Sequence, residues 1–124
     1  MSVAAWILVL VSVLLHVAFF ALEIALPKLP RVQAMFGVRP ESLPVVRPWA
    51  RNQGFYNLFL AAGPAAGLLL VQTGNEGAGR ALVIYACAFM ALCGLVLVTT
   101  DRRFWLAALV QAVPPLLAIA AVLS

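Results

Sequence analysis

Four long apolar runs divide the chain, and each is close to the length that crosses a lipid bilayer. They cover residues 3–26, 53–71, 81–100 and 104–123. Apolar side chains follow one another continuously in each run, whereas a barrel strand would alternate them with polar ones. A helix needs about 20 residues to cross the hydrocarbon core. The pattern therefore predicts an all-α fold, an integral membrane four-helix bundle that forms a single domain over residues 1–124.

The longest polar stretch is the connection between the first two spans, residues 27–52. Its five prolines predict an ordered or extended segment rather than a long helix, with a short interfacial turn at residues 32–37 that dips Met35 and Phe36 into lipid. Residues 1–5 carry no Lys or Arg and the first apolar run is long. We therefore expect a retained first helix rather than a cleaved signal peptide.

The composition excludes most other classes of protein. Hydrophobic residues make up 65% of the 124 residues and charged residues only 10%, against roughly 45–50% and about 25% in soluble domains. A soluble globule of this size could not bury so much apolar surface. Membrane lipids are accordingly the expected surroundings and partners of the chain.

The distribution of basic residues predicts the orientation. The side that carries the first and third loops has seven Lys or Arg residues, and the other side has Arg80 alone. Short cytoplasmic loops are enriched in Lys and Arg, so both loops should be cytoplasmic and both termini extracytoplasmic. Anionic lipid headgroups account for the net charge of +4 better than nucleic acid does, and no nucleic-acid partner is expected. The seven residues are Lys28, Arg31, Arg39, Arg47, Arg51, Arg102 and Arg103.

Polar side chains inside the spans are functional candidates, because lipid disfavours them. His16 and Glu23 are seven residues apart in the first span and share a helix face. Gln53 and Asn57 are four apart at the start of the second span. Three spans therefore bring polar groups to a similar depth on the cytoplasmic side. The candidate binding residues are His16, Glu23, Asn52, Gln53, Tyr56, Asn57 and Gln111.

Two backbone features accompany these residues. Pro114 and Pro115 lie inside the fourth span, just after Gln111, and predict a kink with freed carbonyls. Gly63 and Gly67 form a small-xxx-small pattern in the second span. Such a face lets another backbone approach closely, and we expect it to serve a homo-oligomer. Tight packing is expected on the outer side and an opening toward the cytoplasm.

Simpler interpretations remain for each candidate. The amides at Gln53, Asn57 and Gln111 can cap backbone or join helices. Glu23 can extend to the interface and pair with Arg51 or Lys28. A lone His16 on an apolar helix is commonly a packing residue.

Little in the sequence indicates an enzyme. Cys87 and Cys93 form no Cys-x-x-Cys pair, one histidine alone predicts no metal site, and we expect no cofactor. Glycine-rich phosphate loops and serine nucleophile elbows are absent from the sequence. Any catalysis would use Glu23, with or without His16, as the acid or base.

Residues 51–57 read Arg-Asn-Gln-Gly-Phe-Tyr-Asn, and here the chain resembles a family of small bacterial membrane proteins, domain of unknown function 1304. The resemblance implies four helices, an acidic residue late in the first, an Asn-Gln-Gly-x-Tyr-Asn start to the second, and a Gln ahead of proline in the fourth. Met35-Phe36-Gly37 also looks similar. We expect an inner-membrane location, and the resemblance implies no established activity. The matching positions are Glu23, Asn52, Gln53, Gly54, Tyr56, Asn57 and Gln111.

Three hypotheses follow for the function. The first is a cytoplasm-facing polar pocket, formed by Glu23, Gln53, Asn57 and Gln111, that binds a small polar or amphipathic molecule. The second is a structural or accessory membrane subunit whose polar residues hold helices together. The third is a membrane-embedded enzyme that uses Glu23 on a lipid-soluble substrate.

Overall fold

The chain folds entirely into helices, which confirms the all-α prediction. The computed structural model describes residues 1–124. Four segments are long and apolar enough to cross a membrane, as expected of a multi-pass membrane protein. The long helices are α1 (Val3–Ala25), α3 (Leu43–Gln72), α4 (Glu76–Thr100) and α5 (Trp105–Leu123), and the short elements are α2 (Pro30–Met35), η1 (Pro40–Ser42) and η2 (Arg102–Phe104).

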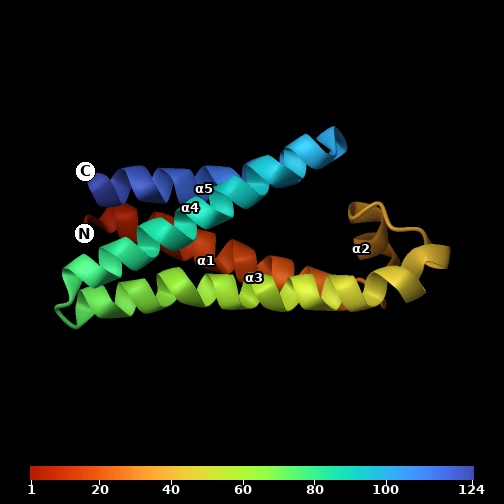
Figure 1. The fold of residues 1–124 in the computed structure, drawn as a ribbon, viewed down its shortest axis with the longest axis horizontal. Coiled ribbons are helices and arrows are strands. Elements are labelled where there is room, and N and C mark those ends of the chain that lie inside the picture. The colour runs from red at the N-terminus through yellow and green to blue at the C-terminus, as the bar shows by residue number, and fades with distance from the viewer.

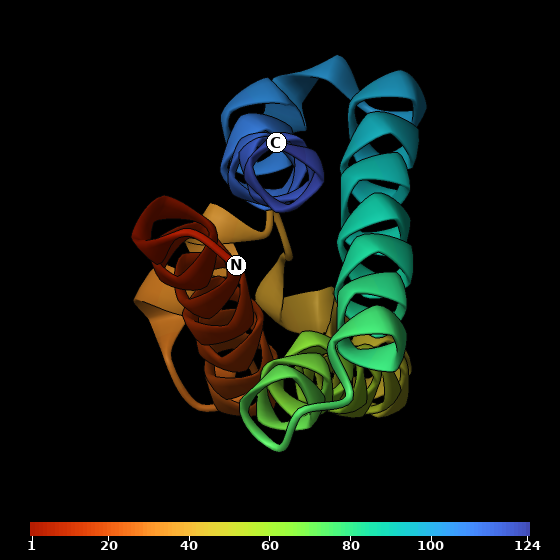
Figure 2. The same cartoon turned by 90° about the vertical axis from the view of Figure 1, so that its left-hand side faces the viewer.

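The long helices pack as a bundle in which each has two main neighbours. The packed pairs are α1 with α3, α3 with α4, α4 with α5, and α5 with α1. Seen end-on, the helices occupy four corners (Figure 2). Both chain termini lie at one end, beside the turn between α3 and α4 (Figure 1). We call this the narrow end, and the opposite end, near α2, the wide end.

Glycines let α3 and α4 touch at the narrow end. A Cβ atom added to Gly67 would lie 2.8 Å from the Gly79 carbonyl oxygen and 2.7 Å from a methyl carbon of Val83. A Cβ atom on Gly63 would lie 3.2 Å from Cβ of Ala86. The face expected to serve an oligomer is therefore filled by α4 of the same chain.

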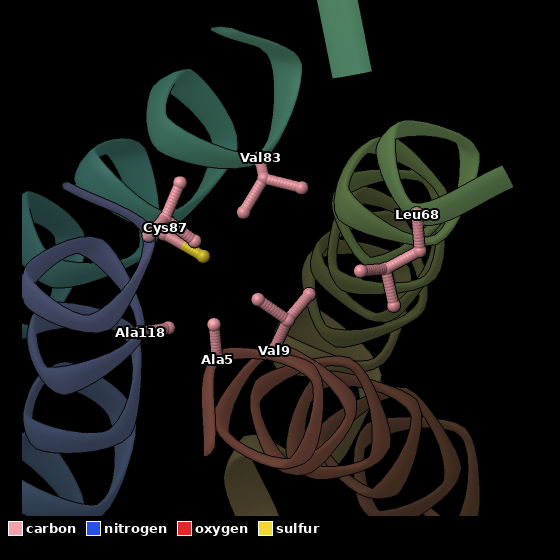
Figure 3. Packing of buried hydrophobic residues seen from close by; sticks show 7 residues of the cluster. Ala5, Val9, Leu68, Val83, Cys87 and Ala118 are labelled. Carbon is pink, nitrogen blue, oxygen red and sulfur yellow. The ribbon is translucent and has the colours of Figure 1, made fainter. Parts of the chain in front are cut away.

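The apolar core lies close to this contact. Seven buried residues from all four long helices form one cluster, and Figure 3 shows their small side chains meeting between the helices. In lipid the hydrophobic effect does not drive helices together, so van der Waals packing contributes much of the association energy. Small residues favour this packing because they let the helices approach closely. The members are Ala5, Val9, Leu68, Val83, Cys87, Ala118 and Val122.

The helices separate toward the wide end. There α4 and α5 diverge from α1 and α3, and the segment that contains α2 lies beside the opening (Figure 1). Gly37 follows α2 with a φ of +65°, a left-handed conformation that glycine adopts freely. A Cβ atom at Gly37 would lie 3.8 Å from the ring of Phe104. The connection after α1 therefore reaches across the opening to the start of α5.

The connection between the first two spans is more helical than the prolines predicted. Residues 43–52, assigned to that connection, form the first turns of α3, and a short helix, α2, replaces the expected interfacial turn. Pro30, Pro40 and Pro44 each stand in the first turn of a helical element. An N–H group would have no helical partner there, so proline is tolerated. Helix α5 likewise continues through Pro114 and Pro115.

A local ion pair holds the connection between α4 and α5. The Asp101 Oδ1 atom accepts a 2.9 Å hydrogen bond from the backbone N–H of Arg103, and Arg103 Nη2 lies 2.7 Å from Asp101 Oδ2. Hydrogen bonds from the Arg103 side chain and backbone hold the pKa of Asp101 below its ordinary value. The pair fixes the short turn that returns the chain into the bundle.

Candidate functional site

A buried carboxyl and a buried amide meet where the bundle begins to open. Asn57 Nδ2 donates a hydrogen bond of 2.9 Å to Glu23 Oε2. Glu23 is 9% exposed and Asn57 7% exposed. The bond joins α1 to α3 and satisfies one oxygen of a carboxyl group that lipid would leave without a partner.

Gly54 makes this contact possible. It stands on α3 one turn before Asn57, and a Cβ atom there would lie 3.3 Å from Cβ of Glu23 and 3.4 Å from the Phe20 carbonyl oxygen. A larger residue would push α3 away from α1. Within the Asn-Gln-Gly-x-Tyr-Asn sequence, the glycine therefore provides packing space for the carboxyl group.

Four of the candidate residues line one cavity of about 450 Å³. Glu23 comes from α1, Gln53 and Asn57 from α3, and Gln111 from α5. The four residues that the sequence places at a similar depth in the membrane therefore lie around the same cavity. The remaining wall consists of Phe19, Phe36, Cys93, Val96, Leu97, Thr100 and Ala107.

A second cavity, of about 380 Å³, adjoins the first. It shares Gln53, Asn57, Cys93 and Gln111 with the first and adds Tyr56. Its other walls are apolar. The two cavities therefore share the same three amides, two from α3 and one from α5.

The amides in these walls differ in their hydrogen bonding. Asn57 donates to Glu23, whereas the side chains of Gln53 and Gln111 form no hydrogen bond within the chain. Gln53 is exposed and Gln111 is half-buried. Each of these two side chains has donors and an acceptor free to bind a molecule in the cavity.

His16 lies apart from this group. It is fully buried two helical turns before Glu23 and lines neither cavity. Its Nδ1 atom donates to the Ser12 carbonyl oxygen at 2.9 Å, and its ring meets Phe19 edge-on with centroids 5.3 Å apart. The Nε2 atom has no hydrogen-bond partner. Phe19, which packs on His16 and lines the cavity, lies between the histidine and the carboxyl group in sequence.

Asn52 also lies outside both cavities. It is exposed on the first half of α3. The interpretation of Glu23 as a surface group paired with Arg51 or Lys28 does not match its geometry, because Glu23 forms no ion pair and bonds Asn57 instead. No three His, Cys, Asp or Glu side chains gather anywhere in the structure.

Several lining residues carried no clear signal in the sequence. Phe36 was expected in lipid, yet it faces the cavity. Cys93 had been considered only for thiol chemistry, and Phe19 resembles any other apolar residue of α1. For Thr100, a polar residue at the end of the third span, the sequence did offer a hint.

The comparison with protein families identifies the chain. The family described as "Protein of unknown function (DUF1304)" matches residues 10–123. The chain therefore belongs to this family, as the 51–57 sequence had indicated. No curated protein and no solved structure matches it.

Proposed function

We propose that this DUF1304 protein resides in the inner membrane with both termini outside the cytoplasm. Its wide end would face the cytoplasm, and the cavity of Glu23, Gln53, Asn57 and Gln111 would bind a small polar or amphipathic molecule. The proposal rests chiefly on one observation: a buried, hydrogen-bonded carboxyl group forms part of the same cavity wall as two amides with free hydrogen-bonding groups.

The distribution of basic residues supports this orientation. The wide end carries the connection from α1 to α3, the first turns of α3 and the connection from α4 to α5, which together hold seven of the eight Lys and Arg residues. Arg80 is the exception and lies near the α3–α4 turn. Basic residues in short loops favour the cytoplasmic side.

The chemistry of the cavity wall supports an amphipathic ligand. Six of the eleven lining residues are hydrophobic, among them Phe19, Phe36 and Leu97. Binding sites of this kind combine an apolar lining with a few polar groups that fix orientation. A molecule with a hydrogen-bonding head and an apolar portion would satisfy both parts of the wall.

The test is the identity and amount of molecules that copurify with the protein. The chain would be extracted from its native membrane in mild detergent, and retained molecules identified by mass spectrometry. We expect a defined molecule with the wild type and its loss in Glu23→Gln and Gln111→Leu. Matched controls are Glu41→Gln and Gln72→Leu, which change the same chemistry at exposed positions outside the cavity. Equal retention by all five proteins would contradict the proposal.

A second candidate function follows from the same hydrogen bond. Because Asn57 and Glu23 join α3 to α1, their role can be to hold the helices together in a structural or accessory subunit. In that case Glu23→Gln would alter thermal stability without altering the copurified molecules. The two measurements on one set of variants separate the candidates.

A further inference from the structure

A separate basic pocket lies on another side of Glu23, at the end of α1. It has a volume of about 260 Å³ and is lined by Glu23, Ile24, Pro27, Lys28, Arg47 and Arg51. It shares only Glu23 with the polar cavity described above. Unlike that cavity, this pocket is lined mainly by charged side chains.

None of the three basic side chains in this pocket forms an ion pair. The ion pairs of the chain involve Glu76 and Asp101 as acids, and neither belongs to this pocket. Arg47 and Arg51 stand four residues apart on α3, a spacing at which like charges repel. Three basic side chains face one carboxyl group, which leaves an excess of at least two positive charges.

The Arg51 side chain is held in place without using its hydrogen-bond donors. Its guanidinium carbon lies 5.6 Å from the centroid of the Phe55 ring. A cation–π contact does not consume N–H donors, and the Arg51 side chain forms no hydrogen bond within the chain, so its donors remain available. A planar edge of this kind matches two oxygen atoms of a phosphate group.

We propose that Lys28, Arg47 and Arg51 form a binding site for a phosphate monoester group. A monoester carries about 1.5 to 2 negative charges near neutral pH, which balances the excess, whereas a diester carries only one. The pocket has room for several water molecules at about 30 Å³ each, enough for the group. The monoester can belong to a lipid headgroup such as that of phosphatidic acid, or to free phosphate.

The binding test uses the full chain in phosphatidylcholine nanodiscs at high ionic strength, which screens exposed charges. One arm adds phosphatidic acid or phosphatidylglycerol to the lipid, and native mass spectrometry counts the molecules retained. The other arm titrates inorganic phosphate into discs without anionic lipid. Retention of phosphatidic acid alone identifies the lipid as the source, and saturable binding of inorganic phosphate identifies the free ion.

The decisive variant is Arg47→Gln/Arg51→Gln, compared with Arg31→Gln/Arg39→Gln. Both pairs remove two exposed positive charges from the same end of the bundle, but only the first pair lines the pocket. We expect about a hundredfold weaker binding in the first pair, tenfold for each lost charged hydrogen bond, and wild-type binding in the second. Gln111→Leu, which alters only the inner cavity, should also bind as wild type. Equal losses in both double variants would overturn the proposal, and so would a wild type that binds no inorganic phosphate and retains the two anionic lipids equally.

Discussion

The bond from Asn57 Nδ2 to Glu23 Oε2, at 2.9 Å, is the one side-chain to side-chain hydrogen bond that joins two long helices. The remaining side-chain to side-chain hydrogen bonds all run from Arg103 to Asp101, within one turn. At the narrow end the N-terminal ammonium group also lies 3.3 Å from Glu76 Oε1, and the core is held by packing of apolar residues. A buried polar contact between two long helices is expected to have a measurable effect when either partner is changed.

The first prediction concerns this pair. Asn57→Leu should lower the free energy of unfolding by about 1–3 kcal/mol, because it leaves a buried carboxyl group without its donor. Glu23→Leu/Asn57→Leu should recover part of that loss, since no polar group then remains unpaired. A double-mutant cycle based on unfolding in detergent measures the coupling, expected at about 0.6 kcal/mol or more. Strictly additive effects would show that the contact does not stabilise the fold.

The second prediction concerns the narrow end. Gly67→Ala should destabilise the bundle by about 1–3 kcal/mol, because its Cβ would lie 2.8 Å from the Gly79 carbonyl oxygen and the helices must separate. Gly77→Ala is the matched control, because a Cβ there meets nothing within 4 Å and alanine favours helix. Thermal unfolding of both variants gives the comparison. If Gly67→Ala were as stable as Gly77→Ala, the close approach of α3 and α4 would be disproved.

The third prediction concerns access to the cavity. Cys93 lines both hollows, whereas Cys87 is fully buried in the core. A small membrane-impermeant thiol reagent should therefore label Cys93 in inside-out vesicles and leave intact spheroplasts unlabelled. Cys93→Ala should abolish the labelling, and Cys87→Ala should preserve it. Labelling from the outer face would reverse the proposed orientation.

The fourth prediction concerns pH. Because Arg103 lowers the folded-state pKa of Asp101, the charged pair should stabilise the fold above the ordinary aspartate pKa of about 3.9. That contribution should disappear as pH falls through the lower, folded-state pKa. Asp101→Asn keeps an oxygen acceptor but removes the charge. The difference in melting temperature between wild type and Asp101→Asn should therefore shrink in acid, and a difference that grows in acid would refute the assignment.

The sequence predicted the bundle because hydropathy reports directly on lipid exposure. The first turns of α3 were missed because two prolines and three polar residues interrupt the apolar residues of segment 43–52, so that no continuous apolar run marks it as part of the helix. Prolines indicated a break there, although Pro44 begins a helix.

The candidate site was predicted in part by equal depth along separate helices. That reasoning brought Glu23, Gln53, Asn57 and Gln111 together, and they line one cavity. It also included His16, which is buried on α1 but lies two turns before Glu23 and lines neither cavity. Phe36 could not be predicted, because its position depends on how the α2 segment packs across the opening toward Phe104.

The most direct test of the ligand-binding proposal is an experimental structure of the protein extracted with its native lipids. The proposal predicts non-protein density in the cavity, within hydrogen-bonding distance of Gln53 and Gln111 and beside the Glu23–Asn57 pair. A closed cavity in which Gln111 bonds Asn57 or Glu23 directly, with no density between them, would contradict it.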